Sequence, residues 1–315
     1  MKQIFLYAGQ GSQTVGMGKD LYETYPEFKN EIDKLEEVLP FSVKELMWQG
    51  PEEKLMQTEY TQPCMAAFAV GLTAVLKAHG IVPDASAGLS LGEYGALYAA
   101  GVWSAEDYVK TVAFRGQAMA DAVKGLDTAM SAVLGLDAAK AEEACKKAED
   151  SGKGFVTVAN YNCPGQYVIC GEQAAVEAAE QAAAELGAKR CIRLKVSAPF
   201  HTKYLEPAGE KLYEHFKNVE FNKPSIPVAM NVSGDFLKDG EDLKELLKAQ
   251  VSNSVRFESD AEALLKAGAE TFIEIGPGNA LSGFVKKTAM RLCIKPQIIS
   301  LTTAADVEKL LAMQA

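Results

Sequence analysis

Histidine is scarce in this sequence, and several patterns that define common classes of protein are missing from it. The chain has 315 residues, of which only three are histidine. Its six cysteines form no Cys-x-x-Cys pair, so a structural zinc site has no support. Basic residues occur in runs of at most two, and the formal net charge is −10. A role in binding nucleic acid is therefore not expected.

Long apolar runs are missing as well. The apolar run at residues 4–8 is interrupted by Gly9 and is too short for a signal peptide. No stretch approaches the roughly 20 apolar residues that cross a bilayer. We therefore expect a cytoplasmic protein with reduced thiols and no membrane contact. Hydrophobic residues make up 48% of the chain, which is enough for one large core or two domains.

One pattern that is present concerns chemistry. Residues 88–92 read Gly-Leu-Ser-Leu-Gly and match Gly-x-Ser-x-Gly. In that pattern the serine stands on a sharp turn between a strand and a helix, where its hydroxyl is exposed as a nucleophile. Residues 85–89 fit a short strand, and residues 93–100 fit a helix that Gly101 ends. The alternative is a glycine-rich turn in which Ser90 has no chemical role, and the lack of β-branched residues in the short strand favours it.

Strands alternate with helices toward both ends of the chain, which predicts an α/β core with a largely parallel sheet. The segment 126–196 instead follows the order β-α-β-β-α-β, which is that of a ferredoxin-like unit. We therefore predict a discontinuous large α/β domain, 1–125 and 197–315, with a small ferredoxin-like α+β domain, 126–196, inserted into it. The predicted elements of the insert are a strand at 129–136, a helix at 138–150 capped by Asp137, strands at 155–159 and 167–170, a helix ending near 186, and a strand at 191–196.

A serine hydroxyl needs a base to take its proton, and histidine suits this task because its ordinary pKa lies near neutral pH. His79 ends a helical segment, where a capping role is expected. His215 lies in a charged helical stretch that we expect on the surface. His201 lies in a loop just after the insert, where it can face a cleft between domains. We therefore predict His201 as the base, the alternative being a histidine with a hinge role only.

Acyl chemistry also needs N–H donors for a developing oxyanion. The main-chain N–H of Leu91 directly follows the nucleophile and is predicted as one donor. Gln10, in the loop after the first strand, is predicted as the second. The pair Gly9 and Gly11 in that loop also begins a dinucleotide fingerprint, but Thr14 stands where the third glycine belongs. No nucleotide cofactor is therefore predicted.

A predicted helix at 105–123 carries an arginine on an apolar face. Tyr108, Val112, Arg115 and Met119 follow a 4-3-4 spacing and share that face. A buried arginine needs a partner, because an unpaired buried charge is very costly. The partner is either a structural Asp or Glu, or a substrate carboxylate held by two parallel hydrogen bonds. The spacing alone leaves both open.

Taken together, these motifs resemble the malonyl-CoA:acyl carrier protein transacylases, from the first strand to about residue 287. The resemblance implies a hydrolase-like α/β domain with a ferredoxin-like insert, the architecture predicted above. The motifs that carry it are Gln-Gly-Ser-Gln at 10–13, Thr-Gln-Pro at 61–63, Gly-Leu-Ser-Leu-Gly-Glu-Tyr at 88–94, Arg-Gly at 115–116, Asn-Tyr-Asn-Cys-Pro-Gly-Gln at 160–166, Pro-Phe-His at 199–201 and Gly-Pro-Gly at 276–278.

The resemblance also implies roles for the catalytic residues. Ser90 is the nucleophile that becomes acylated, and His201 is its base. Gln250 orients His201 through a carbonyl group, in place of the usual aspartate. The main-chain amides of Gln10 and Leu91 form the oxyanion hole.

For the substrate, the resemblance implies that Arg115 holds the free carboxylate of malonate. Phe200 matches the position that goes with malonate over methylmalonate in related acyltransferases. Leu89 departs from the family, which usually has histidine directly before the nucleophile, so no polar role is implied there. The other residues placed in the substrate cleft are Gln62, Asn160 and Met119.

The implied activity is transfer of a malonyl group from malonyl-CoA to the phosphopantetheine thiol of acyl carrier protein, through a malonyl-serine intermediate, in fatty acid biosynthesis. No cofactor is expected, and we expect a monomer. Two alternatives use the same serine: an acyltransferase that serves a polyketide synthase, and a serine thioesterase or esterase. A scaffold without turnover is disfavoured because nucleophile, base and arginine are all present. The resemblance implies an acidic carrier, so Lys189, Lys286 and Lys287 are candidates for a basic docking patch.

Overall fold

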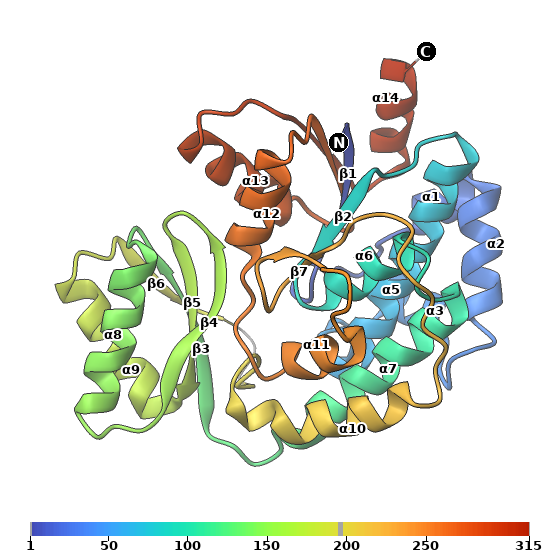
Figure 1. Cartoon of the computed structure of the whole chain (residues 1–315). Helices are drawn as coiled ribbons and strands as arrows, with labels where there is room; N and C mark the ends of the chain where they lie inside the picture. The colour runs from blue at the N-terminus through green and yellow to red at the C-terminus, as the bar shows by residue number, and fades with distance from the viewer. Residues whose placement is uncertain (1, 195–197, 315) are drawn as a thin grey trace.

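A computed structural model describes residues 2–194 and 198–314 of the chain (Figure 1). Its main sheet has four parallel strands in the order β10-β9-β1-β2. The central pairings align Tyr7 of β1 with Gly88 of β2 and with Ile275 of β9. The strands are β1 (Gln3–Tyr7), β2 (Ala85–Gly88), β9 (Thr271–Ile275) and β10 (Gln297–Leu301).

Alternating side chains of β1 pack into two different cores, which makes this part of the molecule a three-layer α/β/α structure. Phe5 and Tyr7 join the larger core, which contains residues of α2, α5, α6 and α7. Ile4 and Leu6 point to the other face, where they pack with α12 and α13. The remaining elements of this part, which we call the large subdomain, are α1 (Lys19–Thr24), α2 (Pro26–Leu35), α3 (Val43–Gln49), α4 (Glu52–Leu55), α5 (Thr58–Ala78), α6 (Leu91–Ala99), α7 (Ala105–Ala122), η1 (Lys203–Leu205), α10 (Glu206–Phe216), β7 (Ala229–Met230), β8 (Asp235–Phe236), α11 (Leu243–Gln250), α12 (Phe257–Lys266), α13 (Ala280–Arg291) and α14 (Ala304–Gln314).

The insert forms an antiparallel sheet in the order β4-β5-β3-β6, with α8 and α9 covering its outer face (Figure 1). We call it the small subdomain, and it has the predicted order β-α-β-β-α-β. Asp137 caps the first of its helices by accepting a hydrogen bond from Lys140 N, as predicted. Its elements are β3 (Thr128–Leu134), α8 (Ala138–Asp150), β4 (Val156–Cys163), β5 (Gln166–Glu172), α9 (Gln173–Glu185) and β6 (Arg190–Arg193).

These observations confirm the predicted fold class. The strand predicted at 155–159 is longer than expected: β4 runs to Cys163, because its pairing with β5 continues to Cys163 and Gln166. β4 also meets the large subdomain at Val255. Tyr161 N donates to Val255 O at 2.8 Å, and Val255 N donates to Ala159 O at 2.9 Å. The end of the strand expected at 191–196, and with it the predicted limit between 196 and 197, lies outside the described residues.

Two glycines permit the close approach of strand, turn and helix at Ser90. A Cβ atom on Gly88 would lie 2.1 Å from the carbonyl O of Gly92, and a Cβ on Gly92 would lie 1.9 Å from the carbonyl O of Tyr7. Any larger residue at either position would force the main chain apart. Between them Ser90 has φ 55° and ψ −102°, a conformation that L residues rarely adopt.

Across 2–194 and 198–314, no helix combines the length and apolar character needed to cross a bilayer.

Candidate active site

The main chain of Ser90 is held on both sides by side-chain amides. Ser90 N donates to Asn231 Oδ1 at 2.7 Å, and Gln250 Nε2 donates to the carbonyl O of Ser90 at 2.8 Å. Asn231 Nδ2 also donates to the carbonyl O of Gly88 at 2.8 Å. These contacts hold a sharp strand-to-helix turn, in which the hydroxyl projects at the first turn of α6.

His201 is in hydrogen-bond contact with this hydroxyl. Its Nε2 lies 2.7 Å from Ser90 Oγ, and its Nδ1 lies 2.8 Å from the main-chain carbonyl O of Gln250. A carbonyl oxygen only accepts, so Nδ1 carries the proton and Nε2 is free to take one from the serine. This is the carbonyl contact that the family resemblance implies for Gln250.

Burial holds His201 in its neutral form. The side chain is 4% exposed, and burial, followed by the nearby positive charge of Arg115, lowers the pKa of His201 to about 4. The hydrogen bond to Gln250 opposes this shift only in part. At neutral pH the imidazole is therefore unprotonated and able to act as a base.

Arg115 lies against the nucleophile and hydrogen-bonds to neutral groups, while the buried carboxyl group of Glu93 acts on its charge without a direct contact. Arg115 is 1% exposed on α7, and within the described ranges no carboxylate forms an ion pair with it. Nη2 donates to Ser90 Oγ at 3.1 Å and to Gln250 Oε1 at 2.9 Å, while Nη1 donates to Gln62 Oε1 at 2.9 Å. Its Nε has no hydrogen-bond partner among the residues described. A positive charge that is buried with neutral partners and a free donor is suited to a carboxylate brought by a substrate.

The loop after β1 lies against the nucleophile turn. A Cβ on Gly9 would be 2.6 Å from the carbonyl O of Leu89, so glycine is needed for this approach. Gln10 is anchored by its side chain, whose Nε2 donates to Thr58 Oγ1 at 3.0 Å. The main-chain N–H groups of Gln10 and Leu91 have no partner within the described part of the chain. Both remain available for an oxyanion.

The other predicted substrate residues divide into two groups. Gln62 on α5 and Met119 on α7 are buried beside Arg115, and Gln62 Nε2 donates to Met119 Sδ at 3.5 Å. Asn160 lies on β4, where it pairs with Val255, and Phe200 directly precedes the base. Both are less than a tenth exposed, and neither hydrogen-bonds to the serine or the arginine in the described structure.

The two other histidines take no part in this site. His79 occupies the C-cap of α5, with Nδ1 2.9 Å from Val75 O, as expected for a capping residue. The expectation that His215 lies on the surface is wrong. Its ring is half-buried and stacks on Phe114 with 4.3 Å between ring centroids, and burial lowers the pKa of His215.

Sequence reasoning missed three buried polar residues behind the nucleophile: Glu93, Asn231 and Asp260. Glu93 is 0% exposed, and its Oε2 accepts from Gln250 Nε2 at 2.8 Å. Its signal was visible, because it is the one charged residue of the otherwise apolar α6. Asn231 and Asp260 lie far along the chain from Ser90, and nothing in their local sequence marks them.

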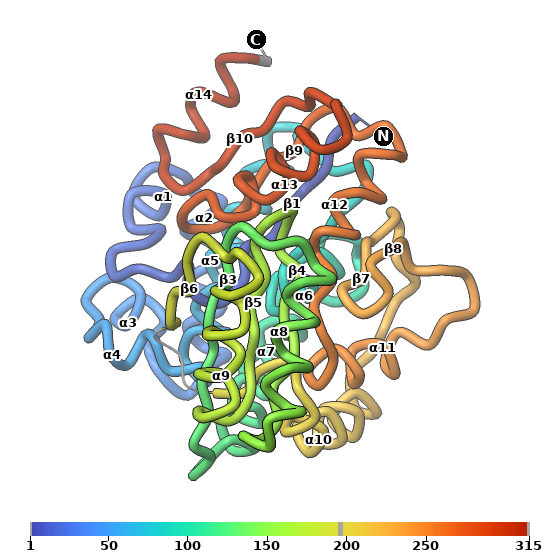
Figure 2. The backbone as a smooth tube through the Cα atoms, turned by 90° about the vertical axis from the view of Figure 1, so that its left-hand side faces the viewer, coloured from blue at the N-terminus to red at the C-terminus, as the bar shows by residue number. Residues whose placement is uncertain are grey.

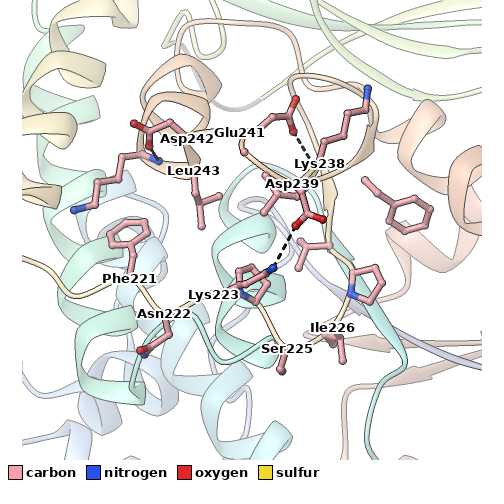
Figure 3. Close-up of a pocket in the computed structure, with 17 residues that line it drawn as sticks. Phe221, Asn222, Lys223, Ser225, Ile226, Lys238, Asp239, Glu241, Asp242 and Leu243 are labelled. Atoms are coloured by element: carbon pink, nitrogen blue, oxygen red, sulfur yellow. Dashed lines mark hydrogen bonds and ion pairs between the residues drawn. The ribbon is translucent and has the colours of Figure 1, made fainter.

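A hollow of about 880 Å³ lies elsewhere, between the segments 221–228 and 236–244 (Figure 3). It contains none of the residues described above. On its rim Lys223 Nζ lies 3.3 Å from Asp239 Oδ1, and the main-chain N of Lys238 donates to Glu241 Oε2 at 2.8 Å. We assign no function to it.

The chain is similar to known proteins in both sequence and structure. Residues 4–309 match the acyl transferase domain family. Malonyl CoA-acyl carrier protein transacylase of Bacillus subtilis (strain 168) is 44% identical over 291 residues, which cover 92% of each chain. The crystal structure of the transacylase of that name from Clostridium perfringens superimposes with a TM-score of 0.94 at 40% identity, covering 100% of this chain and 97% of the other.

A third match was solved with a partner. It is a malonyl-transacylase in complex with a type II PKS acyl-carrier protein, with a TM-score of 0.93 and 34% identity, covering 99% of this chain and 100% of that one. The identities exceed 30% over nearly the full length, and the fold agrees throughout. The chain belongs to the malonyl CoA-acyl carrier protein transacylases, within the acyl transferase domain family.

Proposed function

We propose that this protein transfers a malonyl group from malonyl-CoA to acyl carrier protein, as an enzyme of fatty acid synthesis. The observation that carries this proposal is the buried arginine, whose Nη2 lies 3.1 Å from the hydroxyl of an activated serine. A serine with a base supports acyl transfer in general. The unpaired guanidinium beside it selects acyl groups that end in a carboxylate.

In the first half-reaction, Ser90 Oγ attacks the thioester carbonyl of malonyl-CoA while His201 Nε2 takes the hydroxyl proton. The oxyanion is stabilised by the N–H groups of Gln10 and Leu91, and the positive N-terminus of α6 adds to that stabilisation. The carbon–sulfur bond then breaks, and His201 returns its proton to the departing coenzyme A thiolate. The product is a malonyl ester of Ser90.

In the second half-reaction, the phosphopantetheine thiol of the carrier attacks this ester. His201 accepts the thiol proton and returns it to Ser90 Oγ as the ester bond breaks. The serine is thereby regenerated, and the malonyl group is on the carrier as a thioester. The same base serves both halves, as expected for a ping-pong transfer.

Binding of the substrate carboxylate also makes His201 a stronger base. The positive charge of Arg115 contributes to the lowered pKa of His201. A malonyl carboxylate bound to that guanidinium offsets its charge and so favours the imidazolium that forms during attack. The correct substrate thus improves its own acylation, whereas an acetyl group brings no such charge.

For docking of the carrier, we propose a patch formed by Lys189, Lys286 and Lys287. All three are exposed. Lys286 and Lys287 belong to α13, which lies next to the strands of the small subdomain (Figure 2). Lys287 Nζ on α13 donates to Gln166 Oε1 at 3.5 Å, and Lys189 N donates to the carbonyl O of Leu134, the pairing partner of Gln166. A local patch is needed because the whole chain has a net charge of −10.

Replacement of both Lys286 and Lys287 by alanine is expected to raise the KM for the carrier roughly threefold to tenfold and to weaken its dependence on salt. Acylation by malonyl-CoA alone should not change, because the patch lies outside the site. Steady-state kinetics at two ionic strengths measure this. The matched control removes the exposed lysines Lys19 and Lys34 of α1 and α2. Equal effects of the two double variants would contradict the patch.

The thioesterase alternative differs in what discharges the acyl-enzyme. Isolated malonyl-enzyme is expected to persist in buffer and to lose its malonyl group rapidly when carrier protein is added. Mass spectrometry with and without carrier distinguishes the two outcomes. Rapid discharge by water alone would replace the transferase proposal with a hydrolase. Comparison of a fatty acid synthase carrier with a polyketide synthase carrier separates the two transferase roles.

We also propose that the protein acts as a monomer in the cytoplasm. Nucleophile, base, arginine and supporting amides all come from one chain, so a second copy is not needed to complete the site. The six cysteines are free thiols, of which four are buried, which suits a reducing compartment.

A further inference from the structure

Two buried carboxyl groups lie behind Ser90, and the mechanism above uses neither. Glu93 lies in the first turn of α6 and Asp260 on α12, and both are 0% exposed. In each of them one oxygen has no hydrogen-bond partner among the residues described. Burial of a carboxyl group is costly, so the contacts that each one does make are informative.

Each carboxyl group accepts a hydrogen bond from an amide that holds Ser90. Gln250 Nε2 donates to Glu93 Oε2 and to the carbonyl O of Ser90, both at 2.8 Å. Asn231 Nδ2 donates to Asp260 Oδ2 at 2.8 Å, while its Oδ1 accepts from Ser90 N at 2.7 Å. A carboxylate oxygen only accepts, so each acid fixes which end of its amide faces the nucleophile.

Glu93 connects more of this network than Asp260 does. Its Oε2 also accepts from the main-chain N of Asn231 at 3.2 Å, so both amides meet on it. The carbonyl group of Gln250 in turn holds the base, with His201 Nδ1 at 2.8 Å. A single carboxylate is thus one residue away from both the nucleophile and the base.

The charges around Glu93 come from three helices. Arg115 of α7 favours its ionised form, Asp260 of α12 opposes it, and Tyr94 neighbours it on α6. Because Arg115 has no ion pair among the described residues, Glu93 is the carboxylate that offsets the charge of Arg115 in the unacylated site. Without Glu93, the full charge of Arg115 would act to lower the pKa of His201.

We propose that Glu93 is a positioning residue of the acyl transfer, which as a carboxylate locks Gln250 against Ser90 and His201 and offsets the buried charge of Arg115. The role in acyl transfer rests on the proposed function. The effect of Glu93 on the reactivity of Ser90 is argued from the hydrogen bonds alone. A charged acceptor binds an amide N–H about twice as strongly as a neutral one does. Protonation of Glu93 therefore weakens its hydrogen bond to Gln250 Nε2.

This assignment makes the reactivity of Ser90 depend on pH near neutrality. Burial raises the pKa of Glu93 to about 7, opposed by its hydrogen bonds to Gln250 and Asn231 and by Arg115. Reactivity should therefore increase as the pH rises through about 7 and Glu93 loses its proton. Burial, followed by repulsion from Glu93, raises the pKa of Asp260 well above its ordinary value. Asp260 accepts from one donor, Asn231 Nδ2, whereas Glu93 accepts from two, Gln250 Nε2 and Asn231 N.

The test is the rate at which a fluorophosphonate modifies Ser90 between pH 5.5 and 8.5, in the wild-type protein, Glu93→Gln and Asp260→Asn. The wild-type rate should rise roughly tenfold with a midpoint near pH 7. Glu93→Gln should react at least about tenfold more slowly at pH 8 and show no rise. Asp260→Asn should keep the rise, because Glu93 and its hydrogen bond to Gln250 remain. Glu93→Asp keeps the charge with a shorter reach and should retain the rise at a lower rate.

A normal rise in Glu93→Gln would overturn the proposal, and so would a wild-type rate that does not change between pH 6 and 8. If Glu93→Gln does not fold, infrared titration of the wild-type protein replaces it. Absorption by buried protonated carboxyl groups should then fall with the same midpoint as the rate rises, and different midpoints would contradict the assignment. The probe does not depend on malonyl transfer. A wild-type protein that reacts with the probe but forms no malonyl ester would refute the proposed function and leave this inference standing.

Discussion

Replacement of Arg115 by alanine is expected to lower kcat/KM for malonyl-CoA roughly a hundredfold. This corresponds to a loss of about 3 kcal/mol in transition-state stabilisation. The guanidinium is buried beside Ser90 Oγ and has neutral partners only, so removal of it deprives the malonyl carboxylate of its charged donor. Acetyl-CoA has no carboxylate and should lose about tenfold at most, because Gln62 and Gln250 each lose one contact. Acylation rates with the two substrates measure the change in selectivity.

Arg115→Lys is the matched control that keeps the positive charge but loses the planar guanidinium, which holds two carboxylate oxygens. The preference of this variant for malonyl-CoA over acetyl-CoA should lie between those of the wild-type protein and Arg115→Ala. An equal loss for malonyl-CoA and acetyl-CoA in Arg115→Ala would contradict a carboxylate clamp. It would instead indicate a structural role for the arginine.

Replacement of His201 by alanine is expected to slow acylation of Ser90 on the order of 10³-fold. No other group in the described structure is placed to take the serine proton, because the other hydrogen bond of Ser90 Oγ comes from Arg115, which only donates. The KM for malonyl-CoA should change little, since Arg115 remains. Rapid mixing followed by mass spectrometry gives the acylation rate.

The scarcity of histidine supplies a control for this experiment. His79 caps α5, and its ring nitrogen contacts Val75 O instead of any residue of the site. His79→Ala should therefore be acylated at the wild-type rate. Imidazole added to His201→Ala should restore part of the rate by occupying the space left by the side chain. A His201→Ala protein that acylates normally would remove His201 from the mechanism.

The sequence was most informative where local pattern and geometry coincide. The Gly-x-Ser-x-Gly segment predicted a turn between strand and helix, and the structure has β2 ending at Gly88 and α6 beginning at Leu91. The helical spacing around Arg115 predicted a buried charge but left its partner open between an acid and a substrate. Only the packed structure could show that the groups hydrogen-bonded to Arg115 are neutral.

What the sequence did not reveal depends on contacts between distant segments. Asn231 lies 141 residues from Ser90, and its amide contacts the main chain of the nucleophile only because β7 lies beside β2 in the fold. The extension of β4 to Cys163 depends on its pairing with Tyr167 and Gln166 of β5, and Asn160 also bridges to Val255 of the large subdomain. Such pairings leave no periodic signal in either segment. A helix N-terminus favours an acid whether that acid is exposed or buried, so the position of Glu93 in the first turn did not by itself predict its burial.

The central claim is that Ser90 accepts the malonyl group. Its most direct test is an intact-protein mass spectrum recorded after brief mixing with malonyl-CoA, for the wild-type protein and for Ser90→Ala. The account predicts one malonyl adduct on the wild-type protein, none on Ser90→Ala, and loss of the adduct when carrier protein is added. No adduct on the wild-type protein, or equal adducts on both proteins, would contradict it.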